Sequence, residues 1–166
     1  MCDSRPLAIL AGENGLAASD YLAALAIPLS LADGEQVSRR LNLPADWARV
    51  LRDTIVLQEI SPLISGPSVK ASAVCSALEG LDDNAIAASA RLSQEPQIAG
   101  RLGGYLDVWK QVRPRLPGDD LLTMGVPAGL MVGEILRELL SARLDGLVGN
   151  EEGERALVNQ IISRGS

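Results

Sequence analysis

Apolar residues recur at helical spacing through most of the chain, and short polar or Gly/Pro-containing segments separate the apolar stretches. Two stretches begin with clear capping signals, Ser19 with Asp20 before the first and Ser30 with Asp33 in capping-box spacing before the second. No segment alternates apolar and polar residues between hairpin turns, as a half-buried strand would. The pattern therefore predicts an all-α fold, a multi-helix bundle of about eight or nine helices with short loops.

Proline and glycine give the expected bounds in the first two thirds of the chain. We expect a first helix over YLAALAIPLS that Pro28 ends, a second over GEQVSRRL, a third from Pro44 to about Ile60, a fourth from Pro67 to Gly80, a fifth that Asp82 caps, and a sixth from Pro96 through Trp109. Gly103 and Gly104 lie inside the sixth, where each costs about 1 kcal/mol relative to Ala and can mark close packing or a bend.

The segment from Leu116 to Gly146 places a Gly/Pro turn, GVPAG, between a short helix, DDLLTMG, and a long one. Backbone N–H groups at a helix start bind phosphates, so this turn is either an anion site or a tight packing corner. Asn150 caps a last helix. Prolines and arginines near 113–117 predict a helical body over 1–115 and a smaller helical tail over 116–166, with a helix-hairpin-helix-like turn in the tail.

The amino-acid composition indicates which residues build the core and which cellular compartment to expect. Hydrophobic residues make up 47% of the chain but aromatic residues only 2%, so Leu, Ala, Ile and Val must build the core. Cys2 and Cys75 lie far apart without zinc-ligand spacing, which indicates a reducing cytoplasm rather than a disulfide framework. Neither a membrane-spanning apolar run nor a signal-peptide pattern at MCDSRPLAILAGENG is present, so we expect a soluble cytoplasmic protein with no membrane partner.

The residues needed for most enzyme chemistry are missing. The chain has no histidine, which removes Ser-His-Asp and Cys-His nucleophile systems and the most usual general base at neutral pH. The acidic pairs 82–83, 119–120 and 151–152 each fall where a helix start is expected, and capping explains them. Glu152 and Glu154 point about 200° apart on a helix, so they are not a magnesium pair. We expect no catalytic residue, no metal ligand set and no cofactor in this chain.

Basic residues suggest a binding role instead. A net charge of -6 has the wrong sign for a stand-alone nucleic-acid binder, so any RNA contact must be local or shared with another domain. Arginines at 39, 40, 49 and 52 are typical of a solvated face with ion pairs. A second basic group directly precedes the Gly/Pro turn, so guanidinium and backbone N–H donors could converge on a phosphodiester there. The candidate RNA-binding residues are Lys110, Arg113, Arg115, Gly125, Ala128, Gly129 and Gly133.

The segment GDDLLTMGVPAGLMVGEILRELLSARLDG resembles the C-terminal region of bacterial tRNA nucleotidyltransferases and related poly(A) polymerases, the CCA-adding enzyme family. Members of that family share a pattern like G-x-DL-x-x-x-G-x-PPGP-x-x-G-x-x-L, followed by L-DG and an acidic helix. The matching positions here are Gly118, Asp120, Leu121, Gly125, Pro127, Gly129, Gly133, Leu136, Leu144, Asp145 and Gly146, followed by Glu151, Glu152 and Glu154. Ala128 and Leu130 stand where the family often has proline, which should leave the turn less rigid.

The resemblance covers about Leu22 to Ile162 and implies a body and tail without the family's catalytic head. The head, a nucleotidyltransferase domain that binds magnesium and nucleoside triphosphates, would then be supplied in cis or in trans. The implied function is non-catalytic binding of tRNA, which positions the 3′ end for addition of CCA or part of it. The alternative is a helical protein-interaction or self-association module, in which the turn is a packing corner and Trp47 or Trp109 meets a partner.

Overall fold

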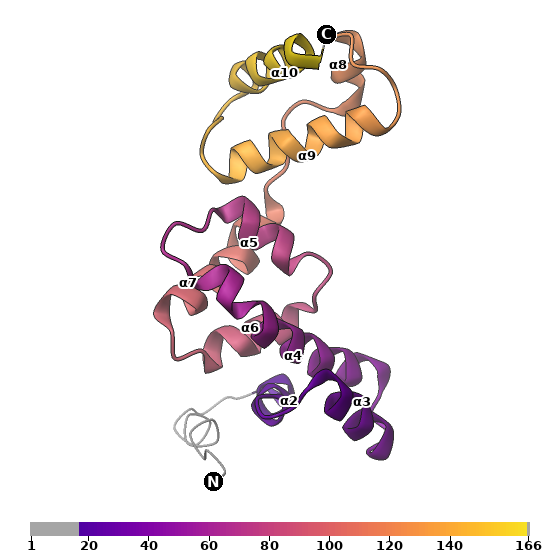
Figure 1. Ribbon diagram of the computed structural model, residues 1–166, viewed down its shortest axis with the longest axis vertical. Coiled ribbons are helices and arrows are strands. Elements are labelled where there is room, and N and C mark those ends of the chain that lie inside the picture. The colour runs from indigo at the N-terminus through magenta and orange to yellow at the C-terminus, as the bar shows by residue number, and fades with distance from the viewer. Residues whose placement is uncertain (1–16, 166) are drawn as a thin grey trace.

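The computed structural model describes residues 17–165, and within that range the chain forms nine α-helices, one short 3-10 helix and no strand (Figure 1). This confirms the predicted all-α class. The segment MCDSRPLAILAGENG and Cys2 lie outside the described residues. The elements are α2 (Ala18–Ala26), α3 (Leu31–Arg40), α4 (Ala45–Ser65), α5 (Ala71–Leu78), α6 (Asp83–Leu92), α7 (Pro96–Asp107), η1 (Trp109–Gln111), α8 (Gly118–Thr123), α9 (Leu130–Leu144) and α10 (Glu151–Gly165).

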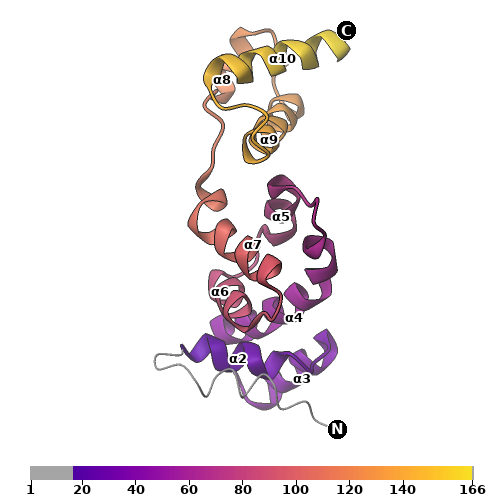
Figure 2. The same ribbon diagram turned by 90° about the vertical axis from the view of Figure 1, so that its left-hand side faces the viewer.

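Helices α2 to α7 with η1 form an N-terminal lobe around the larger apolar core (Figures 1 and 2). Leucine, isoleucine and valine fill that core, as the composition predicts, and Tyr105 is the one aromatic residue among its buried members in the described part of the chain. Alanines lie at the close contact of α2 with α6, where Ala23 and Ala88 are fully buried. Small side chains at this contact let the two helix backbones approach closely.

Helices α8, α9 and α10 form a C-terminal lobe around a second apolar cluster. Its buried members are Leu116, Leu121, Val126, Ile135, Leu139 and Val158. None of them belongs to the core of the N-terminal lobe. The segment 112–117, which holds the predicted boundary between body and tail, joins the two lobes, and α9 faces α5 across the join (Figure 2).

Most predicted helix signals occupy their expected places. Ser30 and Asp33 form a capping box at α3, Asp82 caps α6 and Asn150 caps α10. Pro96 is the first residue of α7, where its missing N–H costs nothing. Among the described residues, no helix combines the length and apolar character needed to cross a membrane.

The bounds of α4 and α5 differ from the prediction. Helix α4 runs through Pro62 to Ser65 instead of stopping near Ile60, because Ile64 is buried in the core of the N-terminal lobe. Arg101 also donates hydrogen bonds to the carbonyls of Ile64 and Gly66, which satisfies acceptors at that helix end. Helix α5 begins at Ala71 rather than at Pro67.

The end of α7 also differs. The prediction extends this helix through Trp109, whereas α7 ends at Asp107 and Trp109 begins η1. The indole of Trp109 folds back over Gly104, where a Cβ would lie 3.4 Å from the nearest ring carbon. Gly104 therefore marks close packing, one of the two roles expected for the glycine pair.

Candidate functional site

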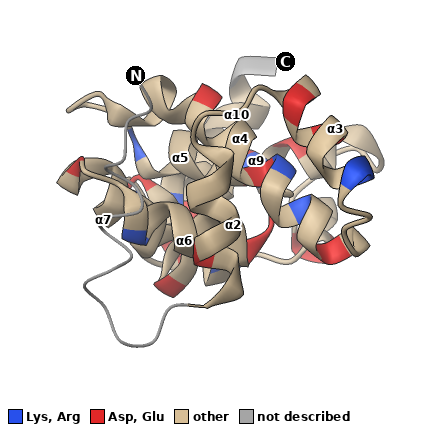
Figure 3. Cartoon of the chain, turned by 90° about the horizontal axis from the view of Figure 1, so that it is seen from below, with Lys and Arg blue, Asp and Glu red and all other residues tan. Residues whose placement is uncertain are grey.

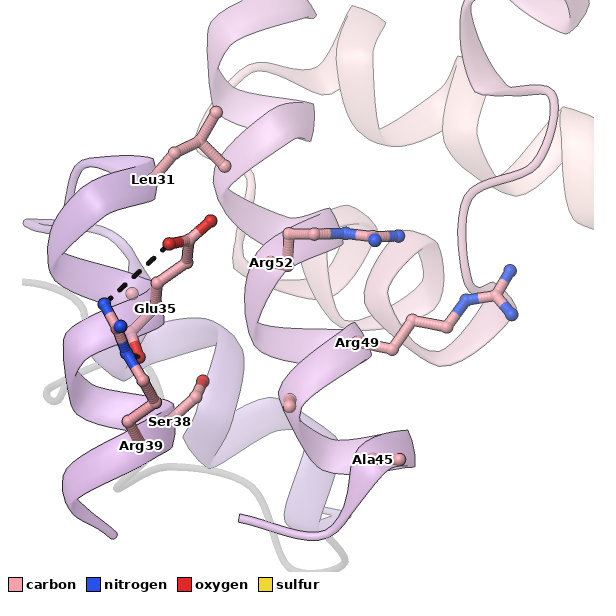
Figure 4. A pocket seen from close by; sticks show the side chains of 9 residues that line it. Leu31, Glu35, Ser38, Arg39, Ala45, Arg49 and Arg52 are labelled. Atoms are coloured by element: carbon pink, nitrogen blue, oxygen red, sulfur yellow. Dashed lines mark hydrogen bonds and ion pairs between the residues drawn. The ribbon is translucent and has the colours of Figure 1, made fainter. Parts of the chain in front are cut away.

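The first arginine group lies on and beside an open groove of about 630 Å³ between α3 and α4. Figure 4 shows the Arg49 and Arg52 side chains extending away from α3, while Arg39 turns toward Glu35, 4.0 Å away. The interpretation of these residues as a face with helix ion pairs is confirmed for Arg39 and Arg49, which pair at i,i+4 spacing. Basic and acidic residues are interspersed over this end of the molecule (Figure 3).

Arg49 and Arg52 both pair with the buried carboxylate of Asp53. The Arg52 Nε and a terminal nitrogen donate to Oδ1 of Asp53 at 2.8 and 2.6 Å, and Arg49 Nε lies 3.5 Å from Oδ2. Asp53, which is fully buried, also accepts the backbone N–H of Asp82 at 2.9 Å. A buried charge is tolerated when it is paired and hydrogen-bonded in this way. Asp53 therefore fixes α4 to the start of α6, and both arginines already have a carboxylate partner.

Lys110 of η1, the first of the predicted contact residues, is also paired. Its Nζ donates to both carboxylate oxygens of Asp83, at 2.6 Å for Oδ1. This hydrogen bond raises the pKa of Lys110 above its ordinary value. The lysine remains exposed, so its pair with Asp83 is a weak surface interaction that a phosphate could replace.

Arg113 and Arg115 are different, because neither forms an ion pair within residues 17–165. The Arg113 guanidinium donates only to the carbonyls of Lys110 and Val112, at 2.8 and 2.7 Å. The Arg115 side chain is exposed. Both residues therefore carry a positive charge that no carboxylate of the described part neutralises.

Glu154 holds the backbone of this joining segment in place. Its fully buried carboxylate accepts the N–H groups of Arg115 and Leu116, each at 2.9 Å through Oε2, and pairs with Arg143 at 2.8 Å. Burial opposes ionisation, but the two N–H groups and the guanidinium outweigh it and lower the pKa of Glu154. The sequence pattern places Glu154 on the acidic last helix and excludes a magnesium pair with Glu152, but it does not indicate this role, because the contact joins residues far apart in the chain.

The Gly/Pro turn contains two glycines with positive φ, and it offers fewer free N–H donors than expected. Gly125 and Gly129 have φ values of 93° and 111°, in the region that favours glycine. The N–H groups of Gly125 and Val126 bond back to Leu122 and Leu121, at 3.0 and 3.1 Å, and Pro127 has none. Within the described chain, Ala128 and Gly129 are the turn residues whose N–H groups stay unbonded.

The surface beside the turn is acidic. A cleft of about 320 Å³ lies next to it, and the charged residues of that cleft are Glu134 and Glu138. Carboxylates at this place repel a phosphate. The structure thus separates the predicted contact residues, because Gly125 lines this cleft whereas Lys110 and Arg113 line another.

That other cleft, of about 410 Å³, lies between the lobes and is hereafter the interlobe cleft. Helix α5 and the aromatic rings of Tyr105 and Trp109 line one side, and α9 lines the other. Its cations are Lys110, Arg113 and Arg137, against Glu79 as the carboxylate that lines it. Arg137 is not among the predicted contact residues, although it lies one helical turn after the predicted contact Gly133.

Arg137 adds a second guanidinium without a carboxylate partner. Its Nε donates to the carbonyl of Gly133 at 3.3 Å, and it forms no ion pair with any residue described here. Arg113 from the joining segment and Arg137 from α9 therefore approach one cleft, with aromatic rings beside them. Guanidinium forks and aromatic faces are the groups that bind phosphates and stack on bases.

Cys75 lines the same cleft, where it is half-buried and packs against the core of the N-terminal lobe. Burial, with the nearby Asp145 carboxylate, raises the pKa of its thiol, so the thiolate is disfavoured. Across residues 17–165, no group of three or more His, Cys, Asp or Glu side chains is placed to hold a metal ion. The cleft therefore offers binding groups and shape.

Comparison with protein-family models, with curated proteins and with solved structures gives no match to this chain.

Proposed function

We propose that the chain is a non-catalytic tRNA-binding module of a tRNA nucleotidyltransferase or poly(A) polymerase-like protein, acting in the cytoplasm. The observation that carries the proposal is the pair of carboxylate-free guanidiniums, Arg113 and Arg137, facing one cleft between two helical lobes. A-form RNA is held largely through its shape, phosphates and 2′-hydroxyls, which such a surface contacts without reading bases. The resemblance of residues 118–146 to that family's C-terminal region supplies the choice of tRNA.

The proposal locates the RNA contact at the interlobe cleft and the joining segment. Lys110, Arg113 and Arg115 contribute side chains there, and Arg137 joins them from α9. Gly133 lies one turn before Arg137 on an exposed part of α9 and allows a close approach. Gly125, Ala128 and Gly129 contribute at most the two free N–H groups of the turn, beside an acidic surface.

Titration of fluorescently labelled tRNA with the 166-residue chain, followed by anisotropy at low salt, tests the proposal. We expect weak binding that falls as salt rises, because phosphate contacts release counterions. Replacing Arg113 and Arg137 by Ala should weaken tRNA binding. Arg39→Ala is the control and should leave binding unchanged, because Arg39 is an exposed arginine of α3 that pairs with Glu35. Absence of binding at low salt, or binding that salt does not affect, contradicts the proposal.

The same proposal assigns the transfer chemistry to a head domain in cis or in trans, which binds magnesium and nucleoside triphosphates. The chain alone should add no nucleotide to a tRNA that lacks its 3′ CCA. Incubation with magnesium, CTP and ATP, analysed by gel electrophoresis, checks this expectation. Any extended product from the pure chain contradicts it.

A specific observation favours a second function, self-association or binding of another protein. The end of the C-terminal lobe near the Gly/Pro turn exposes three apolar side chains, among which Leu130 is 88% exposed and Leu122 and Met131 nearly half exposed. Exposed apolar groups of this kind mark protein contacts when they are contiguous. Light scattering after size-exclusion chromatography measures the molar mass and so tests for self-association. A natural chain that forms a dimer, and a Leu130→Ser variant that stays monomeric, would support the second function.

A further inference from the structure

Trp109 is the aromatic residue of the interlobe cleft whose ring the protein covers only in part. Tyr105, the other aromatic residue that lines the cleft, is 8% exposed and belongs to the core of the N-terminal lobe. Trp109 begins η1, beyond the end of α7, and packs against the same core while it remains half-buried. The indole of Trp109 is therefore the aromatic surface that the cleft offers to a ligand.

Gly104 of α7 contacts one face of this indole. A Cβ at Gly104 would lie 3.4, 3.5 and 3.6 Å from three neighbouring carbons of the ring, Cζ2, Cη2 and Cε2. Nearly equal distances place the Cβ position above the ring plane, because a group at the ring edge would be much closer to one carbon than to its neighbours. The opposite face of the indole is therefore turned away from Gly104, and the indole lines the interlobe cleft.

Two guanidinium groups without a carboxylate partner line the same cleft. Within the described part of the chain, Arg113 and Arg137 donate hydrogen bonds to backbone carbonyls alone. A phosphate accepts hydrogen bonds from guanidinium groups, and a nucleic-acid base stacks on an aromatic face. The cleft, of about 410 Å³, falls in the range of pockets that hold one small ligand, about 300 to 1,000 Å³. Its size and its groups therefore fit a single nucleotide.

We propose that the interlobe cleft binds an unpaired nucleotide of RNA, with its base stacked on the Trp109 indole and its phosphate held by Arg113 and Arg137. This inference rests on the proposed function and names the part of the RNA that the cleft takes. A base inside a duplex is paired and stacked between its neighbours, so it has no free face for the indole. Every base has an aromatic face, so the contact selects unpaired over paired nucleotides without selecting a sequence.

Two labelled RNA hairpins with equal numbers of phosphates test the proposal on the natural chain. One carries a single-stranded tail of adenosines, and the other carries a tail of the same length made of abasic sites. Anisotropy at low salt should show about tenfold tighter binding of the adenosine tail, because a base then stacks on the indole. Equal affinities overturn the stacking proposal but leave salt-dependent RNA binding in place. Absence of binding by both hairpins contradicts the proposed function as well.

The fluorescence of Trp109 reports the stacking contact itself. Trp47 lines a different pocket, so Trp47→Phe leaves Trp109 as the one tryptophan of the chain without changing the interlobe cleft. In this variant the adenosine tail should quench the indole emission in step with binding, and the abasic tail should quench it little. Unchanged emission when the adenosine-tailed hairpin is fully bound overturns the proposal.

Trp109→Leu and Trp109→Phe distinguish stacking from packing. Leucine keeps an apolar side chain against the core but has no aromatic face, so the preference for the adenosine tail should disappear. Phenylalanine keeps a ring and should keep most of that preference. The readout is the ratio of the two affinities, because a loss of packing alone weakens both hairpins equally. A Trp109→Leu variant that is folded by circular dichroism and keeps the natural ratio contradicts the assignment.

Discussion

Asp145 at the end of α9 accepts two hydrogen bonds from Ser72 at the start of α5, at 3.0 Å from its backbone N–H and 2.9 Å from its hydroxyl. Lys70 Nζ lies 3.7 Å from the same carboxylate. Helix α5 has no cap from its own N-cap residue, so the C-terminal lobe supplies the acceptor. Asp145 therefore joins the two lobes and fixes where α5 begins.

Asp145→Ala should destabilise the chain by about 1 to 2 kcal/mol, the usual cost of losing a helix cap. The interlobe cleft should open at the same time, because Asp145 accepts the hydrogen bonds of Ser72 and pairs with Lys70 across this join. Urea unfolding measures the first effect and the rate of proteolytic cleavage within 112–117 the second. Asp107→Ala, an exposed residue at the end of α7, is the control and should change neither by much.

Glu154→Gln should destabilise the C-terminal lobe by about 3 kcal/mol, because it leaves the Arg143 guanidinium without its charged partner. It also weakens the acceptor that holds the N–H groups of Arg115 and Leu116. Glu152→Gln, an exposed residue in the same helical turn, should cost less than about 0.5 kcal/mol. Equal unfolding midpoints for the two variants would show that Glu154 does not hold the segment.

Acid should unfold the chain through the same group. The pKa of Glu154 is lowered from 4.5, so its ionised form adds stability that is fully present above pH 4.5 and is lost as pH falls through the lower folded value. The natural chain should therefore lose stability steeply below pH 4.5, and Glu154→Gln should lose less over that range. Parallel pH profiles of the unfolding free energy in the two proteins would contradict this assignment.

Gly133→Ala should have opposite effects on the stability of the chain and on its affinity for tRNA. A Cβ at Gly133 meets nothing within 4 Å, so alanine should stabilise α9 by about 0.5 to 1 kcal/mol. If RNA lies against this face, the added methyl group should weaken tRNA binding even though the free chain is more stable. Thermal unfolding and anisotropy give the two readouts, and unchanged tRNA affinity removes Gly133 from the contact surface.

Local signals explain what the sequence could predict. The capping box of Ser30 and Asp33 and the caps at Asp82 and Asn150 act within one helical turn, so their residue types alone place the helix starts. The left-handed glycines at 80, 125, 129 and 146 are local in the same sense. Each depends on backbone geometry that few other residues adopt.

The deviations come from contacts between residues far apart in the chain. Helix α4 passes Pro62 because Arg101 bonds the carbonyls at its end, and α5 starts late because Asp145 caps it. Arg137 joins Arg113 only after the lobes pack. The order of residues along the chain does not indicate which of these distant residues meet. Arg113 was expected to lie beside the Gly/Pro turn, but it lines the interlobe cleft, whereas Gly125 of the turn lines a different one.

The salt dependence of tRNA affinity tests the interlobe cleft most directly. Each arginine that contacts a phosphate adds about 0.7 to 0.9 to the slope of log affinity against log salt. The Arg113→Ala, Arg137→Ala double variant should therefore bind more weakly and with a slope smaller by about 1.5, whereas Arg39→Ala keeps the slope of the natural chain. A double variant with the natural slope and affinity would contradict the account, because the two guanidiniums would then contact no phosphate.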